Sequence, residues 1–176
     1  MKRLFSLAIM LAVAPAFAQT PTAAQVIDAA KVSAKKSGKN ILVIFHASWC
    51  GWCHKLDDFL TKTDEGKLVG KGLEIVHLTV LESERHKADE NAGGVDMMKA
   101  WGGEKAGLPF MAILDAKGKL VINSLMKKDE QGSNTGYPAA ATEVAHFITM
   151  LEKGAKKISA DERGKIGAWL TANAPK

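Results

Sequence analysis

The residues in this sequence best suited to chemistry are its two cysteines, Cys50 and Cys53, which are separated by Gly51 and Trp52. Two thiols at this spacing can exchange with a disulfide, because the thiolate of one attacks and the other resolves the mixed disulfide. A disulfide between them closes too small a loop to stabilise a fold much through chain entropy. Redox chemistry therefore explains the pair better than a structural staple does.

The cysteines lie where a buried strand gives way to a helix. The run Ile41–His46 is apolar up to its last residue and rich in β-branched side chains, which predicts a strand buried on both faces. After the cysteines, apolar residues recur at helical spacing and predict a helix over Gly51–Lys62. Unpaired N–H groups in the first turn of a helix favour negative charge. We therefore expect Cys50 to be the exposed, attacking thiolate and Cys53 to be the resolving thiol.

The stretch Phe45–Cys53, reading FHASWCGWC, resembles the active site of the thioredoxin family, in which a strand leads into W-C-x-x-C and then a helix. A second stretch, Gly107–Phe110, resembles the family's loop that carries a cis-proline facing the cysteines. The likeness extends over roughly Lys39 to Leu151. It implies an α/β thioredoxin fold with a central mixed sheet, helices on both faces and, in this chain, an extra C-terminal helix. It also implies thiol–disulfide exchange.

The resemblance suggests further residues around the cysteines. The bond between Leu108 and Pro109 would be cis and would offer a backbone edge to an extended substrate, whereas the alternative is a plain edge or turn proline. Trp49 and Trp52 would form an apolar rim for a protein partner, with Trp52 at the surface and Trp49 partly buried. Gly136 resembles the glycine of a third loop near the site, or is an ordinary turn glycine.

The sequence departs from the family at Ile44, where a buried acidic residue commonly handles the proton of the second thiol. His77 matches the family's usual lysine on the next strand. A histidine with a pKa of roughly 6.5 could do this proton work near neutrality, and the alternative is a histidine satisfied in or near the core. His54 is either a solvated helix residue or, when protonated, a partner for the Cys50 thiolate.

A second function also fits the motif. Cys50–His54 matches C-x-x-C-H, the attachment pattern of a c-type haem, in which His54 would be the proximal ligand. The candidate distal ligands are Met97, Met98 and Met126. A small helical cytochrome would have neither the strand before the motif nor the Gly-Leu-Pro-Phe loop.

A third function is a non-catalytic or metal-delivering module that keeps the same fold for binding. Cys50, Cys53, His46 and His54 make a candidate Cys2His2 set, but the chain has no second C-x-x-C. We expect neither a metal nor another cofactor. The missing acid at position 44 is the best argument for this module.

The first 18 residues predict a secretory signal. They combine a basic start, an apolar stretch too short to span a membrane, and an A-x-A site at 16–18. We expect cleavage between Ala18 and Gln19 and a periplasmic or secreted protein, with an uncleaved anchor as the alternative.

Cleavage would leave residues 19–176 as one thioredoxin-like domain, with a core at about 39–153 and a helical extension at about 155–176. Loss of Lys2 and Arg3 lowers the net charge from +5 to +3, and the remaining basic residues are scattered singly or in pairs. This pattern gives no case for nucleic acid. We expect a monomer that exchanges disulfides with protein thiols and with a membrane-bound redox partner, in a direction that the sequence does not set.

Capping boxes at Thr22–Gln25 and Ser159–Glu162 predict the starts of two helices, the first ending near Ser37. Other patterns predict strands at 73–81, 110–114 and 120–124, and helices near 95–101 and at 139–153. The strand at 73–81 should pair in parallel with 41–46. Glycines predict a turn region over Gly66–Gly72, and polar residues predict a loop over 125–137.

Overall fold

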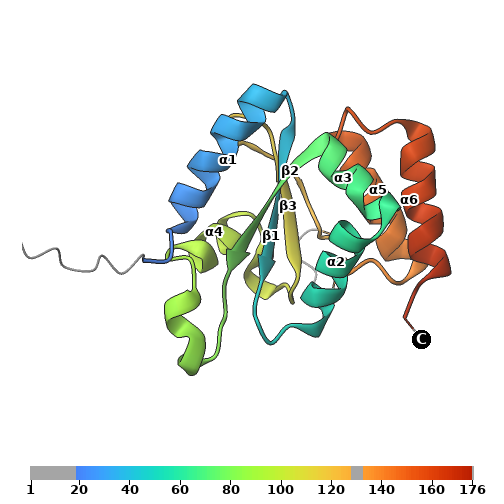
Figure 1. Cartoon of the computed structure of the whole chain (residues 1–176). Coiled ribbons are helices and arrows are strands. Elements are labelled where there is room, and N and C mark those ends of the chain that lie inside the picture. The colour runs from blue at the N-terminus through green and yellow to red at the C-terminus, as the bar shows by residue number, and fades with distance from the viewer. Residues whose placement is uncertain (1–18, 128–132, 176) are drawn as a thin grey trace, which may run out of the picture.

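A computed structural model describes residues 19–127 and 133–175 of the chain (Figure 1). Its sheet has four strands in the order β2-β1-β3-β4. Strand β1 (Asn40–His46) pairs in parallel with β2 (Leu73–Thr79) and antiparallel with β3 (Phe110–Leu114). Strand β4 (Leu120–Asn123) pairs antiparallel with β3 at one edge. The predicted mixed sheet is confirmed.

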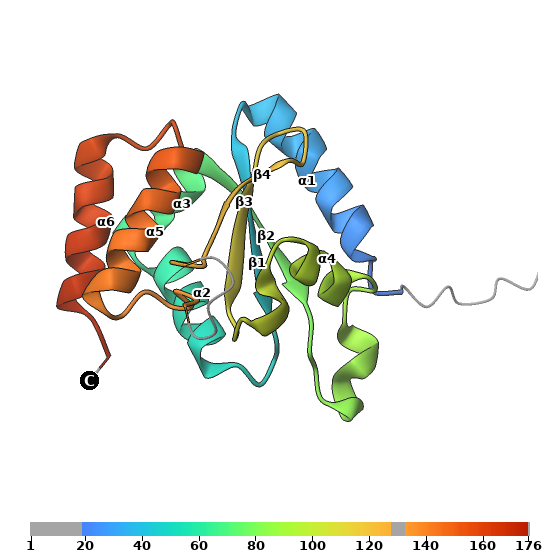
Figure 2. The same cartoon turned by 180° about the vertical axis from the view of Figure 1, so that it is seen from behind.

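Helices cover both faces of this sheet, as Figures 1 and 2 show. One face carries α1 (Ala23–Ser37) and α4 (Gly94–Ala100). The other carries α2 (Gly51–Lys62), α3 (Asp64–Gly72), α5 (Ala141–Gly154) and α6 (Ala160–Ala172). The two short 3-10 helices are η1 (Glu84–Asp89) and η2 (Gly103–Lys105). The predicted thioredoxin fold with an added C-terminal helix is therefore confirmed.

Strand β1 contributes to two separate hydrophobic cores. Leu42 and Ile44 face the core beneath α2, α3, α5 and α6, while Ile41, Val43 and Phe45 face the core beneath α1 and α4. Because successive side chains of a strand point to opposite faces, a strand buried on both sides must be apolar throughout. This explains the continuous apolar run that leads to the cysteines.

The added helix α6 packs on its neighbouring helices. Ile166 and Leu170 are fully buried, and the Trp169 ring lies 5.1 Å from the ring of Phe59 on α2. The predicted capping box is present: the Ser159 hydroxyl accepts from the N–H of Glu162 at 3.2 Å, and the Glu162 carboxylate accepts from the N–H of Ser159 at 2.8 Å. The first box, between Thr22 and Gln25, is confirmed in the same way at the start of α1.

The prediction of a turn region over Gly66–Gly72 is wrong, because these residues lie in α3. Thr63 caps the helix by accepting from the N–H of Gly66 at 2.9 Å. A Cβ at Gly66 would lie 1.9 Å from the carbonyl oxygen of Phe59, and one at Gly72 would lie 2.5 Å from Ile158. These glycines therefore permit close packing of helices rather than a turn.

One predicted strand ends earlier than expected, and two predicted segments lie wholly or partly outside the described residues. Strand β2 ends at Thr79 rather than Leu81, whose φ of 54° turns the chain out of the sheet. The predicted leader over 1–18 and residues 128–132 of the predicted loop lie outside the described residues.

Candidate functional site

Cys50 is the N-cap of α2, four residues after the end of β1. Its Sγ accepts a hydrogen bond from the N–H of Cys53 at 3.1 Å, and the two cysteines form a disulfide with a Cα–Cα distance of 5.2 Å. The predicted position at the start of a helix is therefore found. The N–H groups at this end of α2 would also favour a thiolate on Cys50 once the disulfide is reduced.

The expectation that Cys50 is exposed is wrong for this disulfide form. Cys50 is 4% exposed and Cys53 is 1% exposed, and both pack with Ala47 and Leu108. Leu108 belongs to the predicted proline loop, so that loop shelters the disulfide. A partner must therefore reach past the apolar side chains of Ala47 and Leu108 to contact the sulfur of Cys50.

The segment that leads from β1 to Cys50 is anchored by the loop after β2. The carboxylate of Glu82 accepts from the hydroxyl of Ser48 at 2.7 Å and from its N–H at 2.5 Å. The indole N–H of Trp49 donates to the carbonyl of Leu81 at 2.8 Å, and Nε2 of His54 lies 2.9 Å from the carbonyl oxygen of Ser48. Four hydrogen bonds thus fix the two residues before Cys50.

Glu82 is 8% exposed, yet its environment favours the charged form. Burial pushes the pKa of Glu82 upward, but the hydrogen bonds from the side chain and backbone of Ser48, with the charges of His86 and His46, lower the pKa below its ordinary value of 4.5. The anchor is therefore a carboxylate at neutral pH.

His77 lies beside Ile44 in the parallel register of β1 and β2. Its Nε2 is 2.8 Å from Oδ1 of Asp57 on α2, and its ring is 5.0 Å from that of His46. Asp57 follows Cys53 by four residues, so the two side chains share one face of α2, one turn apart. The pair of Asp57 and His77 thus lies next to the turn that carries the buried thiol.

The charges in this cluster influence one another. Burial raises the pKa of Asp57, but the hydrogen bond from His77 and the charges of His77 and His46 lower it overall. Burial lowers the pKa of His46 from 6.5, the charge of His77 lowers it further, and the carboxylates of Asp57 and Glu82 oppose the shift. His46 is therefore biased toward its neutral form.

The bond between Leu108 and Pro109 is cis, as expected. The side-chain amide of Asn134 donates to the carbonyl of Gly107 at 2.8 Å and to that of Pro109 at 3.0 Å, and its Oδ1 accepts from the hydroxyl of Ser124 at 2.6 Å. Ser124 in turn accepts from the N–H of Met111 on β3. This chain of hydrogen bonds ties the proline loop to the sheet.

A pocket of about 390 Å³ adjoins the proline loop. The rings of Trp52 and Tyr137 line this pocket and stack on each other, with their centroids 6.0 Å apart. The pocket is also lined by Gly107, Leu108, Asn134 and Gly136. Gly136 has a φ of 55°, and a Cβ there would lie 4.0 Å from Cδ of Pro109. The structure therefore brings Trp52, Leu108 and Gly136 together.

Three of the large exposed hydrophobic side chains lie around the cysteines. Trp49 is 61% exposed, Trp52 is 47% exposed and Leu81 is 44% exposed. The expectation that Trp49 is partly buried is wrong, because its indole reaches outward to the Leu81 carbonyl instead of into a core. Leu81 was not expected at the site, since nothing in the sequence near it marks its turn.

A sequence model of a protein family described as thioredoxin-like matches residues 22–116, more than half of the chain. The chain belongs to the thioredoxin-like family. A search of the curated proteins found no match for this thioredoxin-like chain.

Solved structures also resemble the thioredoxin-like chain. A disulphide isomerase from Xylella fastidiosa Temecula1 is 20% identical, with a TM-score of 0.49, over 90% of this chain and 96% of that one. The DsbH oxidoreductase is 20% identical, with a TM-score of 0.43, over 84% of this chain and 95% of that one. The oxidised C-terminal domain of Neisseria meningitidis DsbD is 16% identical, with a TM-score of 0.45, over 65% of this chain and 90% of that one.

Within residues 19–127 and 133–175, no three His, Cys, Asp or Glu side chains are placed to hold a metal ion together. His54, the fourth member of the candidate Cys2His2 set, is bonded to the Ser48 carbonyl instead. The strand-led thioredoxin-like fold also differs from the small helical cytochrome that the haem alternative requires. In the same part of the chain, no helix combines the length and apolar character needed to cross a bilayer.

Proposed function

We propose that this chain is a thiol–disulfide oxidoreductase that acts on protein partners outside the cytoplasm. The observation that carries the proposal is the position of Cys50, the N-cap of α2, with the N–H of Cys53 directed at its sulfur. A thiolate formed there is stabilised by the helix terminus. Cys53 is already within bonding distance, because the two sulfurs form a disulfide.

In the reducing direction, the Cys50 thiolate attacks one sulfur of a partner disulfide. The bond between the partner's sulfurs breaks, its second sulfur leaves as a thiolate, and a mixed disulfide joins Cys50 to the partner. The Cys53 thiolate then attacks Sγ of Cys50, so the partner leaves as a dithiol and the disulfide between Cys50 and Cys53 forms. The reverse sequence oxidises a dithiol, and the reduction potentials of the two couples set the direction.

A protein partner suits the surroundings of the cysteines. Trp49, Trp52 and Leu81 expose a large apolar area beside a disulfide that is itself almost covered. Aromatic side chains of this kind supply much of the buried area in protein contacts. The proline loop and Gly136 line the adjoining pocket, where an extended segment of a partner could lie. Protein thiols and disulfides, and a membrane-bound redox partner, are thus the proposed partners of a monomer.

Resolution by Cys53 requires that its thiol lose a proton, although it is 1% exposed. Asp57 lies one turn away on the same helix and is bonded to His77. With Ile44 on the neighbouring strand unable to accept a proton, we assign proton handling to Asp57 and His77. His54 contacts Ser48 and supports the loop rather than this exchange.

The test is a turbidity assay of insulin reduction by the mature chain with dithiothreitol as the electron donor. Activity should be present in the native chain and lost in Cys50→Ser. Cys53→Ser should accumulate a mixed disulfide with insulin that gel electrophoresis detects without reductant. Inactivity of the native chain in both insulin reduction and oxidation of a reduced peptide would overturn the proposal in favour of a binding module. A potential measured in glutathione buffers then gives the direction: near roughly −270 mV favours a reductant and near roughly −120 mV an oxidant.

A further inference from the structure

The sheet topology brings several chain segments to the pole opposite the cysteines. Strands β1, β2 and β4 begin at this pole and β3 ends there, whereas Cys50 follows the other end of β1. Helices α1 and α5 also end there. A hydrogen bond of 2.9 Å from the Asn40 side chain to the Gly154 carbonyl joins the start of β1 to the end of α5.

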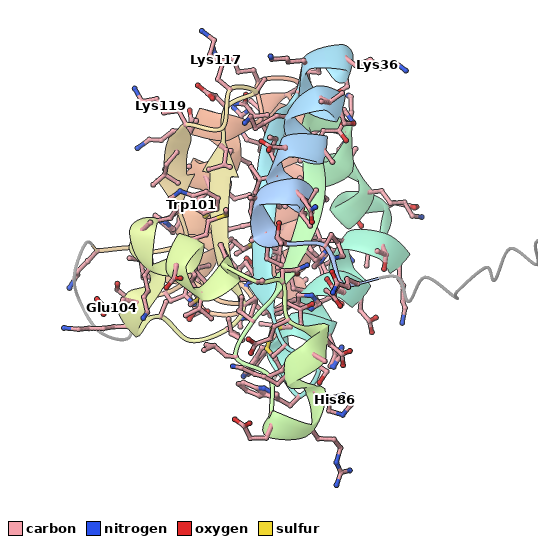
Figure 3. The ribbon with its side chains drawn as sticks, turned by 90° about the vertical axis from the view of Figure 1, so that its left-hand side faces the viewer. Lys36, His86, Trp101, Glu104, Lys117 and Lys119 are labelled. Atoms are coloured by element: carbon pink, nitrogen blue, oxygen red, sulfur yellow. A yellow bond between two sulfur atoms is a disulfide. The ribbon has the colours of Figure 1, made fainter. Side chains whose placement is uncertain are left out.

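Lysines gather on these segments, although they are scattered in the sequence. They come from the end of α1, from the turn between β3 and β4, and from the end of α5 with the residues after it. We call this set the lysine pole: Lys35, Lys36, Lys39, Lys117, Lys119, Lys153, Lys156 and Lys157. Figure 3 shows Lys36, Lys117 and Lys119 projecting at one end of the molecule, with His86 at the other.

A shared hollow and a hydrogen bond join parts of the lysine pole. Lys39, Lys153, Lys156 and Lys157 line one hollow of about 320 Å³. The ammonium of Lys157 donates to the carbonyl of Ser37 at 2.5 Å, which joins the α5 side to the end of α1. Every member except Lys39 is exposed.

Little of this positive charge is neutralised. Glu74 lies 3.7 Å from Lys39, and the carboxylate of Asp115 is occupied by the N–H groups of Lys117 and Lys119. Glu152 is the third carboxylate on these segments. Among the described residues, seven lysines of the pole form no ion pair: Lys35, Lys36, Lys117, Lys119, Lys153, Lys156 and Lys157.

Stabilisation of helix ends accounts for the positions of only some lysines of the lysine pole. Lys35, Lys36 and Lys153 lie in the last turns of α1 and α5, where a positive charge complements the helix dipole. Lys117, Lys119, Lys156 and Lys157 lie outside any helix, so the dipole does not account for them.

We propose that the lysine pole binds the surface of an anionic phospholipid membrane. Clusters of four to eight basic side chains bind acidic headgroups, each contributing through simple charge attraction. The segments that carry the lysines, 35–39, 115–119 and 153–157, contain no arginine for bidentate recognition and no aromatic side chain on which bases could stack, so nucleic acid is a poorer match. A membrane held at this pole would leave the disulfide facing away and open to partners.

The test is co-sedimentation of the mature chain with vesicles of phosphatidylglycerol and phosphatidylcholine, and with phosphatidylcholine alone. Binding should require phosphatidylglycerol and should be lost in about 0.5 M salt, where charge attraction is screened. The triple variant Lys153→Gln, Lys156→Gln, Lys157→Gln should bind on the order of 100-fold more weakly, at about fivefold for each lysine removed. The matched control is Lys62→Gln, Lys99→Gln, Lys105→Gln, which removes the same charge elsewhere.

The control should bind within a fewfold of the native chain, and both triple variants should still exchange disulfides in solution. Absence of vesicle binding, or an equal loss in both variants, would overturn the proposal. Tighter binding to a duplex DNA oligonucleotide than to the vesicles at the same salt would also overturn it, in favour of a nucleic-acid surface. These outcomes do not depend on redox activity, so they separate this proposal from the proposed function.

Discussion

The buried carboxylate of Glu82 holds Ser48, two residues before Cys50, through both its hydroxyl and its backbone N–H. The carbonyl of Leu81, which precedes Glu82 in the loop after β2, accepts a hydrogen bond from the indole N–H of Trp49. The loop after β2 therefore sets the path of the chain into the N-terminus of α2. The geometry of the cysteine pair therefore depends on Glu82, a residue 34 positions from Ser48 in the sequence.

Glu82→Ala should destabilise the protein by about 1–3 kcal/mol, because it leaves the donors of Ser48 without their acceptor. Glu82→Gln should cost less, since its amide oxygen can still accept one of the two bonds. Denaturant unfolding of the oxidised protein measures both. The control is Glu84→Ala, an exposed glutamate in η1, which should change stability by no more than about 0.5 kcal/mol. An equal effect at both positions would mean that the contacts with Ser48 contribute nothing.

Acid should weaken the same anchor. Because the folded pKa of Glu82 lies below its ordinary value of 4.5, the unfolded state binds its proton first as the pH falls. The stabilisation is therefore complete above about pH 4.5 and is lost as the pH falls through the lower folded pKa. Unfolding measured from pH 6 down to about pH 3 should show a shallower loss of stability in Glu82→Gln than in the native protein. Parallel curves would contradict this assignment.

Asp57→Asn should slow resolution of the mixed disulfide without preventing attack by Cys50. The amide cannot take a proton, and it leaves His77 without its charged partner. The expected result is a tenfold or greater accumulation of mixed disulfide and a shifted pH profile of turnover, in line with general acid–base contributions of about 10²–10⁴. The control is the next residue, Asp58→Asn, whose exposed carboxylate pairs with Lys62 at 2.7 Å. Identical pH profiles for the native chain and Asp57→Asn would remove Asp57 from proton handling.

The sequence predicts features whose partners are close along the chain. The two capping boxes join residues three positions apart, and the apolar run of β1 carries its own signature of burial. Glu82, Asn134 and Asp57 could not be placed in the same way, because their partners lie 34, 27 and 20 residues away. Only the fold brings such residues together. The lysine pole was missed for the same reason.

The wrong prediction of a turn at Gly66 leads to a paired test of two glycines in helices. Gly66→Ala should destabilise the protein by about 3 kcal/mol or more, because its Cβ would clash with the Phe59 carbonyl at the junction of α2 and α3. Gly164→Ala, in α6 with no atom within 4 Å of the new Cβ, should stabilise by about 0.5–1 kcal/mol. Thermal unfolding of the two variants should therefore shift in opposite directions. A neutral Gly66→Ala would show that α3 is not packed as described.

Asn134 should matter more for partner binding than for the cysteines themselves. Asn134→Ala removes the donors that hold the carbonyls of Gly107 and Pro109, and it should cost about 1–3 kcal/mol of stability. Asn134→Asp should be at least as harmful, since it keeps the acceptor for Ser124 but turns a carboxylate toward two carbonyl oxygens.

Both variants should lose more activity toward insulin than toward glutathione disulfide, because only an extended protein segment needs the proline loop and the pocket beside it. Asn173→Ala serves as the control, since that amide only caps α6 through the Trp169 carbonyl. Equal losses toward insulin and glutathione disulfide would mean that Asn134 acts on overall stability or on the cysteines. The ratio of the two activities, measured at a temperature where every variant is folded, decides between these roles.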